Sequence, residues 1–121
     1  MYEIRIHGRG GQGAVMAGGI LATAMVNEGK HVVAVPSFGF ERRGAPVASF
    51  LRMDTREIRQ MTNIYRPDCV LCIEVLRYLR DPGPCVREMA RVVRPGGVVL
   101  VTATPLLNLN GYWLVNRLAV A

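Results

Sequence analysis

With 121 residues, half of them apolar, the chain is long enough for one domain with a genuine core, spanning residues 1–121, and too short for two. A formal charge of +6 favours acidic partners, but no recognisable nucleic-acid module accompanies it, so we expect no nucleic-acid partner. No signal peptide or 18-residue apolar span occurs, and three cysteines cannot all pair, which predicts a soluble cytoplasmic protein that does not contact a membrane.

The first predicted strand, residues 2–7, alternates in polarity and ends in the run GRGGQG at residues 8–13. That run leads into a predicted helix over about residues 12–28, which Gly29 is well placed to end. The first backbone N–H groups of such a helix are unpaired and attract anions, phosphate above all. We therefore take as candidate ligand-binding residues Gly8, Gly10, Gly11, Gln12 and Gly13.

The next predicted strand, residues 31–35, completes a strand–helix–strand unit that the handedness rule closes into a right-handed parallel crossover. No acidic residue ends this strand to hold a ribose, so the glycine run does not indicate a dinucleotide. The intervening helix is rich in alanine and glycine. Its small side chains predict close packing either against the sheet or against a neighbouring subunit, and the sequence leaves both open.

Residues 37–46 are a predicted loop with unusual contents, and a predicted strand follows at residues 47–53. The loop has two interpretations, ligand recognition or a solvated turn whose carboxylate pairs locally. Its candidate binding residues are Glu41, Arg42, Arg43 and Gly44.

The alternation of strands and helices continues with predicted strands near residues 68–74 and 98–102, a helix near 82–93 and a Pro-Gly-Gly turn at 95–97. A short amphipathic stretch follows at 112–118. The pattern predicts an α/β fold: a three-layer, Rossmann-like, mostly parallel sheet with helices on both faces. Cys69 and Cys72 fall three apart in one predicted strand, so they point to opposite faces and indicate core residues rather than a metal pair.

Up to about residue 72, the chain resembles the gamma subunit, or the equivalent domain, of 2-oxoacid:ferredoxin oxidoreductases of the pyruvate type. Two separate motifs carry the resemblance, IRIHGRGGQGAVMAGGILATA at residues 4–24 and PSFGFERRGAPVASFLRMD at residues 36–54. The resemblance implies an accessory subunit of a complex that oxidatively decarboxylates pyruvate or a related 2-oxoacid to an acyl-CoA. Thiamine diphosphate and iron–sulfur clusters would lie in partner subunits, and ferredoxin would be an indirect partner.

For this chain, the same resemblance implies subunit docking and closure over coenzyme A. The guanidinium groups of Arg42 and Arg43 suit phosphate, which they bind in a bidentate manner.

From residue 72 to about 118 the chain instead resembles the C-terminal half of a class I S-adenosylmethionine-dependent methyltransferase, on motifs such as RVVRPGG at residues 91–97. The two resemblances predict a hybrid that joins two α/β families near residues 69–73. S-adenosylmethionine is thus the alternative ligand, and a degenerate methyltransferase or an inert hybrid the alternative function. The carboxylates that hold this cofactor in such enzymes are replaced here by His7 and by Val35 or Pro36.

No catalytic constellation and no metal site is predicted. The two histidines are isolated at strand positions, and no paired carboxylates occur at helical spacing. His7 is predicted to be either a ligand contact or a packed or solvated residue. Glu74 is predicted to be either a residue near a substrate cleft or a cap or surface charge. We therefore expect a chain that is not catalytic alone.

Overall fold

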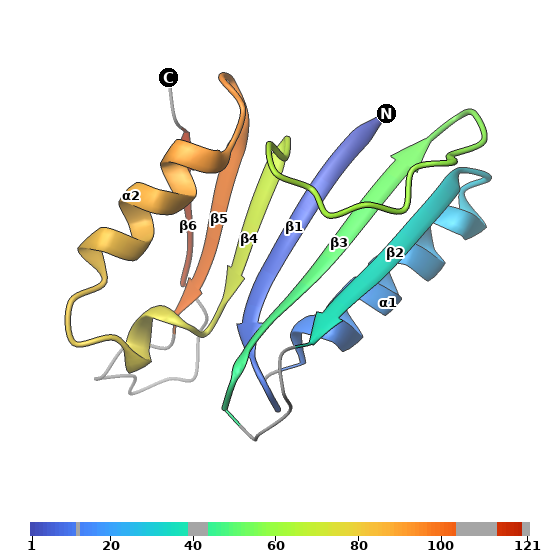
Figure 1. The fold of residues 1–121 in the computed structure, drawn as a ribbon. Coiled ribbons are helices and arrows are strands. Elements are labelled where there is room, and N and C mark those ends of the chain that lie inside the picture. Colours follow the sequence, from blue (N-terminus) through green and yellow to red (C-terminus); the bar gives the residue numbers. More distant parts are fainter. Residues whose placement is uncertain (12, 39–43, 104–113, 120–121) are drawn as a thin grey trace.

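A computed structural model describes residues 1–11, 13–38, 44–103 and 114–119 (Figure 1). The elements in chain order are β1 (Tyr2–Arg9), α1 (Ala14–Asn27), β2 (His31–Phe38), β3 (Pro46–Asp54), β4 (Cys69–Ile73), the short 3-10 helix η1 (Leu76–Tyr78), α2 (Gly83–Val92), β5 (Val98–Ala103) and β6 (Leu114–Ala119).

The strands form one six-stranded sheet in the order β2-β3-β1-β4-β5-β6. β1 pairs in parallel with β4, and β4 with β5, whereas β3 runs antiparallel to both β1 and β2, and β6 runs antiparallel to β5. The α/β class is confirmed, and β1, β2, β4 and β5 share one direction. The sheet is nevertheless mixed, because β3 lies between the two strands of the predicted crossover unit and returns from β2 as an antiparallel neighbour.

Each face of the sheet is partly covered by one helix, α1 on one face and α2 on the other. Ile4 and Ile6 point to the α1 side, where they pack with Leu51 and Ala14. Figure 1 shows α1 beside β2 and β3, and α2 beside β5. Two helices on opposite faces of a central sheet give the predicted three layers.

The α2 side has its own core. Val70 and Cys72 of β4 are buried there with Val99 of β5 and Met89 of α2. Cys69 instead packs with the α1-side cluster. The two cysteines of the CxxC motif therefore point to opposite faces, as predicted.

Close approach between α1 and the sheet depends on two glycines. A Cβ atom on Gly8 would lie 2.5 Å from the Cβ of Ala14, and one on Gly18 would lie 2.6 Å from Ser49 Oγ. The interpretation that small residues let α1 pack against the sheet is thus confirmed at Gly18. At the helix end, Gly29 has a φ of 78°, and its N–H donates to Val26 O at 2.9 Å, as predicted for this glycine.

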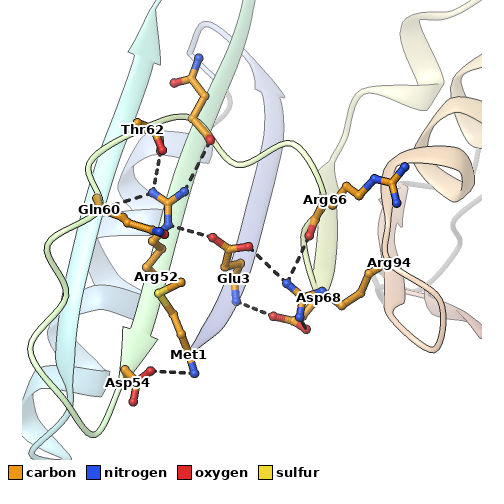
Figure 2. Close-up of polar contacts among 10 residues, drawn as sticks. Met1, Glu3, Arg52, Asp54, Gln60, Thr62, Arg66, Asp68 and Arg94 are labelled. Atoms are coloured by element: carbon orange, nitrogen blue, oxygen red, sulfur yellow. Dashed lines mark hydrogen bonds and ion pairs between the residues drawn. The ribbon is translucent and has the colours of Figure 1, made fainter.

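A buried ion network holds the long loop after β3 across the α2 side of the sheet (Figure 2). Arg52 is only 3% exposed; its Nε donates to Glu3 Oε1 at 2.8 Å and its Nη1 to Thr62 O at 2.6 Å. Arg94 bridges Glu3 Oε2 at 3.3 Å and Asp68 Oδ1 at 2.8 Å. Arg52 therefore joins β1, β3 and the loop through one guanidinium group.

Candidate functional site

The two motifs singled out in the sequence meet at the carboxyl end of β1. The N–H of Gly10 donates to Ala45 O at 2.8 Å, and the N–H of Gly44 donates back to Gly10 O at 3.2 Å. Arg9 Nε adds a third link, to Gly44 O at 2.9 Å. The glycine turn and the end of the second motif therefore form one site, although more than thirty residues separate them in the sequence.

The glycines of this site adopt backbone conformations that favour glycine, and they face open space. Gly11, Gly13 and Gly44 have φ values of 88°, 79° and 88°. No atom of the described residues lies within 4 Å of where their Cβ atoms would be. A ligand can therefore approach the backbone of the turn closely.

The amino end of α1 opens onto the same turn. Gly13 is the N-cap residue, no side-chain cap bonds to it among the described residues, and the first turn of the helix contains no acidic residue. The helix dipole therefore presents a partial positive charge at this point without a carboxylate to neutralise it. This arrangement suits an anion.

The predicted site residues divide into three groups. Gly11, Gly13 and Gly44 border the open space, whereas Gly8 is buried against Ala14 and the N–H of Gly10 is already paired. The close packing of Gly8 accounts for its presence without a ligand. The remaining candidates lie outside the described residues and stay predictions: Gln12, Glu41, Arg42 and Arg43.

A cavity of about 640 Å³ lies next to the turn, on the α2 side of the sheet. Alternate residues of β1 contribute cationic and polar groups to it: Arg5, His7 and Arg9. Its opposite wall comes from η1 and α2, including Tyr78 and Glu88. A volume of this size is typical of pockets for small organic ligands.

Burial sets the protonation of the groups that line this cavity. Desolvation, with a smaller contribution from the positive charge of Arg5, lowers the pKa of His7 from 6.5 to about 4, so His7 is neutral at pH 7. Burial raises the pKa of the Cys72 thiol to about 11, with a smaller contribution from the nearby Cys85. Cys72 is therefore a protonated thiol and not a ready nucleophile, in keeping with its predicted place in the core.

Tyr78 places η1 over the end of β1. Two guanidinium groups contact its ring, with Arg9 Cζ at 5.2 Å and Arg77 Cζ at 5.0 Å from the ring centroid. Each such contact at an exposed site contributes about 0.5–1 kcal/mol. The contact with Arg9 links η1 to the end of β1, where the glycine turn begins, whereas the contact with Arg77 lies within η1.

Glu74 directly follows β4 and makes local contacts. It adopts a φ of 53°, its N–H donates to Thr102 Oγ1 at 3.1 Å, and its Oε2 lies 3.5 Å from Arg77 Nη1. It therefore shapes the turn between β4 and η1.

Arg5 and Arg9 were missed by the sequence analysis as residues of a site. A signal for them exists, because Arg5, His7 and Arg9 alternate along a strand and must share one face. No local signal marks Tyr78 or Glu88, which reach the cavity only through the fold.

The neutral, buried state of His7 makes the stability of the protein depend on pH. Because the pKa is about 4 when folded and 6.5 in the reference state, the unfolded chain binds an extra proton between these values. We expect the stabilisation to be complete above pH 6.5 and to fall as pH drops to 4, by on the order of 2 kcal/mol. Urea denaturation across this range tests it, and the His7→Gln variant should lack the slope.

The matched control for this experiment is His31→Gln, at an exposed position of β2. It should keep the slope. Asp54 titrates lower, because a hydrogen bond from the N-terminal ammonium group lowers its pKa from 3.8 to about 2. A slope unchanged in His7→Gln would show that His7 is not its source.

Within the described part of the chain, no helix is long and apolar enough to span a membrane. No group of three or more histidine, cysteine, aspartate or glutamate residues gathers there as a metal site.

Comparisons with known proteins support the first resemblance. Residues 3–113 match the family model of pyruvate ferredoxin/flavodoxin oxidoreductase. The chain is 73% identical over 74 residues to the gamma subunit of NADH-dependent phenylglyoxylate dehydrogenase from Aromatoleum evansii, covering 61% of this chain and 39% of that protein. It is 48% identical to the pyruvate/ketoisovalerate oxidoreductase common subunit gamma of Thermococcus kodakarensis, covering 96% of this chain and 72% of the relative.

A solved structure gives the same result for the fold. The pyruvate oxidoreductase subunit PORC of Thermotoga maritima superposes with a TM-score of 0.63 at 32% identity, covering 89% of this chain and 52% of that one. The chain spans about half the length of the relatives that it matches, from 39% to 72%.

The methyltransferase resemblance gains no support from these comparisons. The family match runs through residue 113 and so crosses the join that we placed at residues 69–73. The RPGG sequence has a structural explanation: Gly96 has a φ of 77°, and a Cβ on Gly97 would lie 2.7 Å from Asp68 O. A tight turn from a helix into a buried strand favours such glycines in α/β proteins of any family. From β1 through β5, the chain belongs to the pyruvate ferredoxin/flavodoxin oxidoreductase family.

Proposed function

We propose that this chain is the gamma-type component of a cytoplasmic complex that oxidatively decarboxylates pyruvate or a related 2-oxoacid to an acyl-CoA. Its contributions are docking to the catalytic subunits and closure over coenzyme A. Thiamine diphosphate and iron–sulfur clusters belong to the partner subunits in this proposal, with ferredoxin as the indirect electron acceptor. The observation that carries it is the meeting of the two family motifs through Gly10, Gly44 and Ala45.

The residues of the turn fit the phosphate groups of coenzyme A. Gly11 and Gly13 leave open space above an uncapped helix start, and the Arg9 guanidinium lies beside them. The guanidinium groups of Arg42 and Arg43 would each add bidentate, charge-assisted hydrogen bonds to phosphate. Bound coenzyme A supplies the thiol that accepts the acyl group; this chain holds and encloses it.

The outer side of α1 supports docking to another subunit. The helix, AVMAGGILATAMVN, contains no charged residue. Met16, Ile20 and Val26 are 70%, 65% and 55% exposed. An apolar helix face of this kind marks a surface for a protein partner.

Co-purification tests the docking role. The tagged chain, co-expressed with the thiamine-binding subunits from the same genome, should recover them, and Ile20→Glu should reduce recovery at least tenfold because it buries a charge in the interface. Met61→Glu is the matched control, since Met61 is 71% exposed but lies in the loop after β3. Full recovery with Ile20→Glu would exclude α1 as the docking face, and no recovery by the unaltered chain would overturn the subunit role.

A thermal-shift titration of the assembled complex tests coenzyme A closure. Coenzyme A should raise the melting temperature by mass action, and pantetheine, which lacks the phosphates, should raise it much less. The shift should be lost in Gly13→Ala and in Arg43→Ala. Gly19→Ala, at an exposed helix position with no atom within 4 Å of the new Cβ, should keep it. Equal shifts with coenzyme A and pantetheine would rule out phosphate recognition by the turn.

A further inference from the structure

The cavity on the α2 side of the sheet is lined by Arg5, which forms no ion pair with a carboxylate among the described residues. Arg5 Nε is buried and has no hydrogen-bond partner among the described residues. Arg5 forms no ion pair within the same residues, and the hydrogen bond from Nη1 to Ile64 O is long, at 3.5 Å. The Arg5 Cζ lies 5.5 Å from the ring centroid of Phe50, a contact that supplies no formal negative charge, so Arg5 has no anionic partner among the described residues.

The carboxylate that lines the cavity does not fill that role. Glu88 lines the cavity and its charge acts on Arg5, but its two oxygens accept hydrogen bonds from Arg91 at 2.6 and 2.7 Å. Glu88 is also exposed, whereas the Arg5 Nε is buried. The positive charge of Arg5 is therefore available to a ligand that enters the cavity.

The other walls define the rest of the ligand. His7 is neutral at pH 7 and adds a hydrogen-bond donor without adding charge. The wall formed by β4 and α2 is apolar, with Cys72 and Met89 buried and Val92 beside them. One cation, one neutral imidazole and an apolar wall match a single negative charge on an apolar body, and the planar guanidinium fork matches a carboxylate.

We propose that this cavity binds a small organic carboxylate with an apolar body, the carboxylate on Arg5 beside His7 and the body against Cys72, Met89 and Val92. This site lies beside the glycine turn but uses different residues. It does not depend on the proposed function, because neither coenzyme A nor a partner subunit enters the argument.

Isothermal titration calorimetry of the whole chain with 3-phenylpropanoate tests the proposal. We expect a dissociation constant of about 1 mM or below, and at least about tenfold weaker binding of the matched neutral ligand, 3-phenylpropanamide. Inorganic phosphate should not compete. Equal binding of acid and amide, competition by phosphate, or no binding of the acid at about 10 mM would each overturn the proposal.

Variants locate the site independently of the ligand series. Arg5→Gln should weaken binding of 3-phenylpropanoate at least about tenfold, and Glu88→Gln should strengthen it several-fold by removing a repelling charge. Arg59→Gln is the control, because the Arg59 side chain is 86% exposed and does not line the cavity. Ala48→Leu fills the cavity without changing its charge and should abolish binding. This variant tests the site even if Arg5→Gln does not fold. Unchanged binding in Ala48→Leu would place the ligand elsewhere and overturn the assignment.

Discussion

Replacing Arg52 with alanine is expected to lower the free energy of unfolding by about 3–5 kcal/mol, the range measured when one partner of a buried ion pair is removed. The guanidinium is 3% exposed and donates to Glu3 Oε1 at 2.8 Å and Thr62 O at 2.6 Å (Figure 2). Alanine would leave the Thr62 carbonyl without this donor. Glu3 would keep only the longer contact with Arg94, at 3.3 Å, in this network.

Urea denaturation at pH 7 measures this loss, with Arg59→Ala as the control. Arg59 pairs with Glu57 at 3.4 Å, but both side chains are largely exposed, and we expect a change within about 0.5 kcal/mol. A loss below about 1 kcal/mol in Arg52→Ala would show that the loop after β3 is held by its apolar contacts, such as buried Ile64, and not by the ion network.

The same network connects stability to the candidate site. The loop that Arg52 holds also places the Ile64 carbonyl near Arg5 Nη1. The position of the Arg5 guanidinium therefore depends in part on a loop that lies at the opposite end of β1 from the glycine turn (Figure 1).

Local signals predicted much of the fold. The alternation of residues 2–7 predicted β1 and its buried face, and Gly29 ends α1 in the left-handed conformation as expected. The CxxC spacing predicted cysteines on opposite faces. Each of these features is decided by residues close together in the sequence, so the sequence alone was enough.

The order of the strands was not predictable in the same way. A strand–helix–strand unit predicts that its two strands run in parallel, and β1 and β2 do. Nothing in residues 31–54 indicates that β3 enters between them, because a strand paired with β2 alone would show the same polarity pattern. The contacts that join β3 to β1 are distant in the sequence, as in the buried pair of Arg52 with Glu3, which lies 49 residues away.

The same distinction between local and distant residues applies to the candidate site. The glycine turn was predicted because its spacing is local and its conformations need glycine. The cavity was not predicted, since its cationic side comes from β1 and its apolar wall from residues more than sixty positions later. The methyltransferase resemblance, which gained no support, rested on short local segments, and one of them, RPGG, forms a turn that has a structural explanation in this fold.

The contact between Gly8 and Ala14 provides a decisive test of how the glycine turn is built. Gly8→Ala is expected to lower the free energy of unfolding by about 3 kcal/mol, the upper part of the range for overpacking. The new Cβ would lie 2.5 Å from the Cβ of Ala14, an atom fixed to the backbone that cannot rotate away. Relief requires α1 to move off β1 at its amino end, where the turn lies.

The double variant Gly8→Ala/Ala14→Gly restores the missing space by exchanging the two residues. We expect it to recover at least about half of the stability lost in Gly8→Ala, even though Ala14→Gly alone destabilises the helix by about 0.5–1 kcal/mol. Gly19→Ala, where the new Cβ meets no atom within 4 Å, should be neutral or slightly stabilising. Strictly additive losses in the double variant would mean that the two residues do not compete for the same space. In that case Gly8 would be required for a reason other than its contact with Ala14, and the turn would owe its shape to the hydrogen bonds that join Arg9 and Gly10 to residues 44–45.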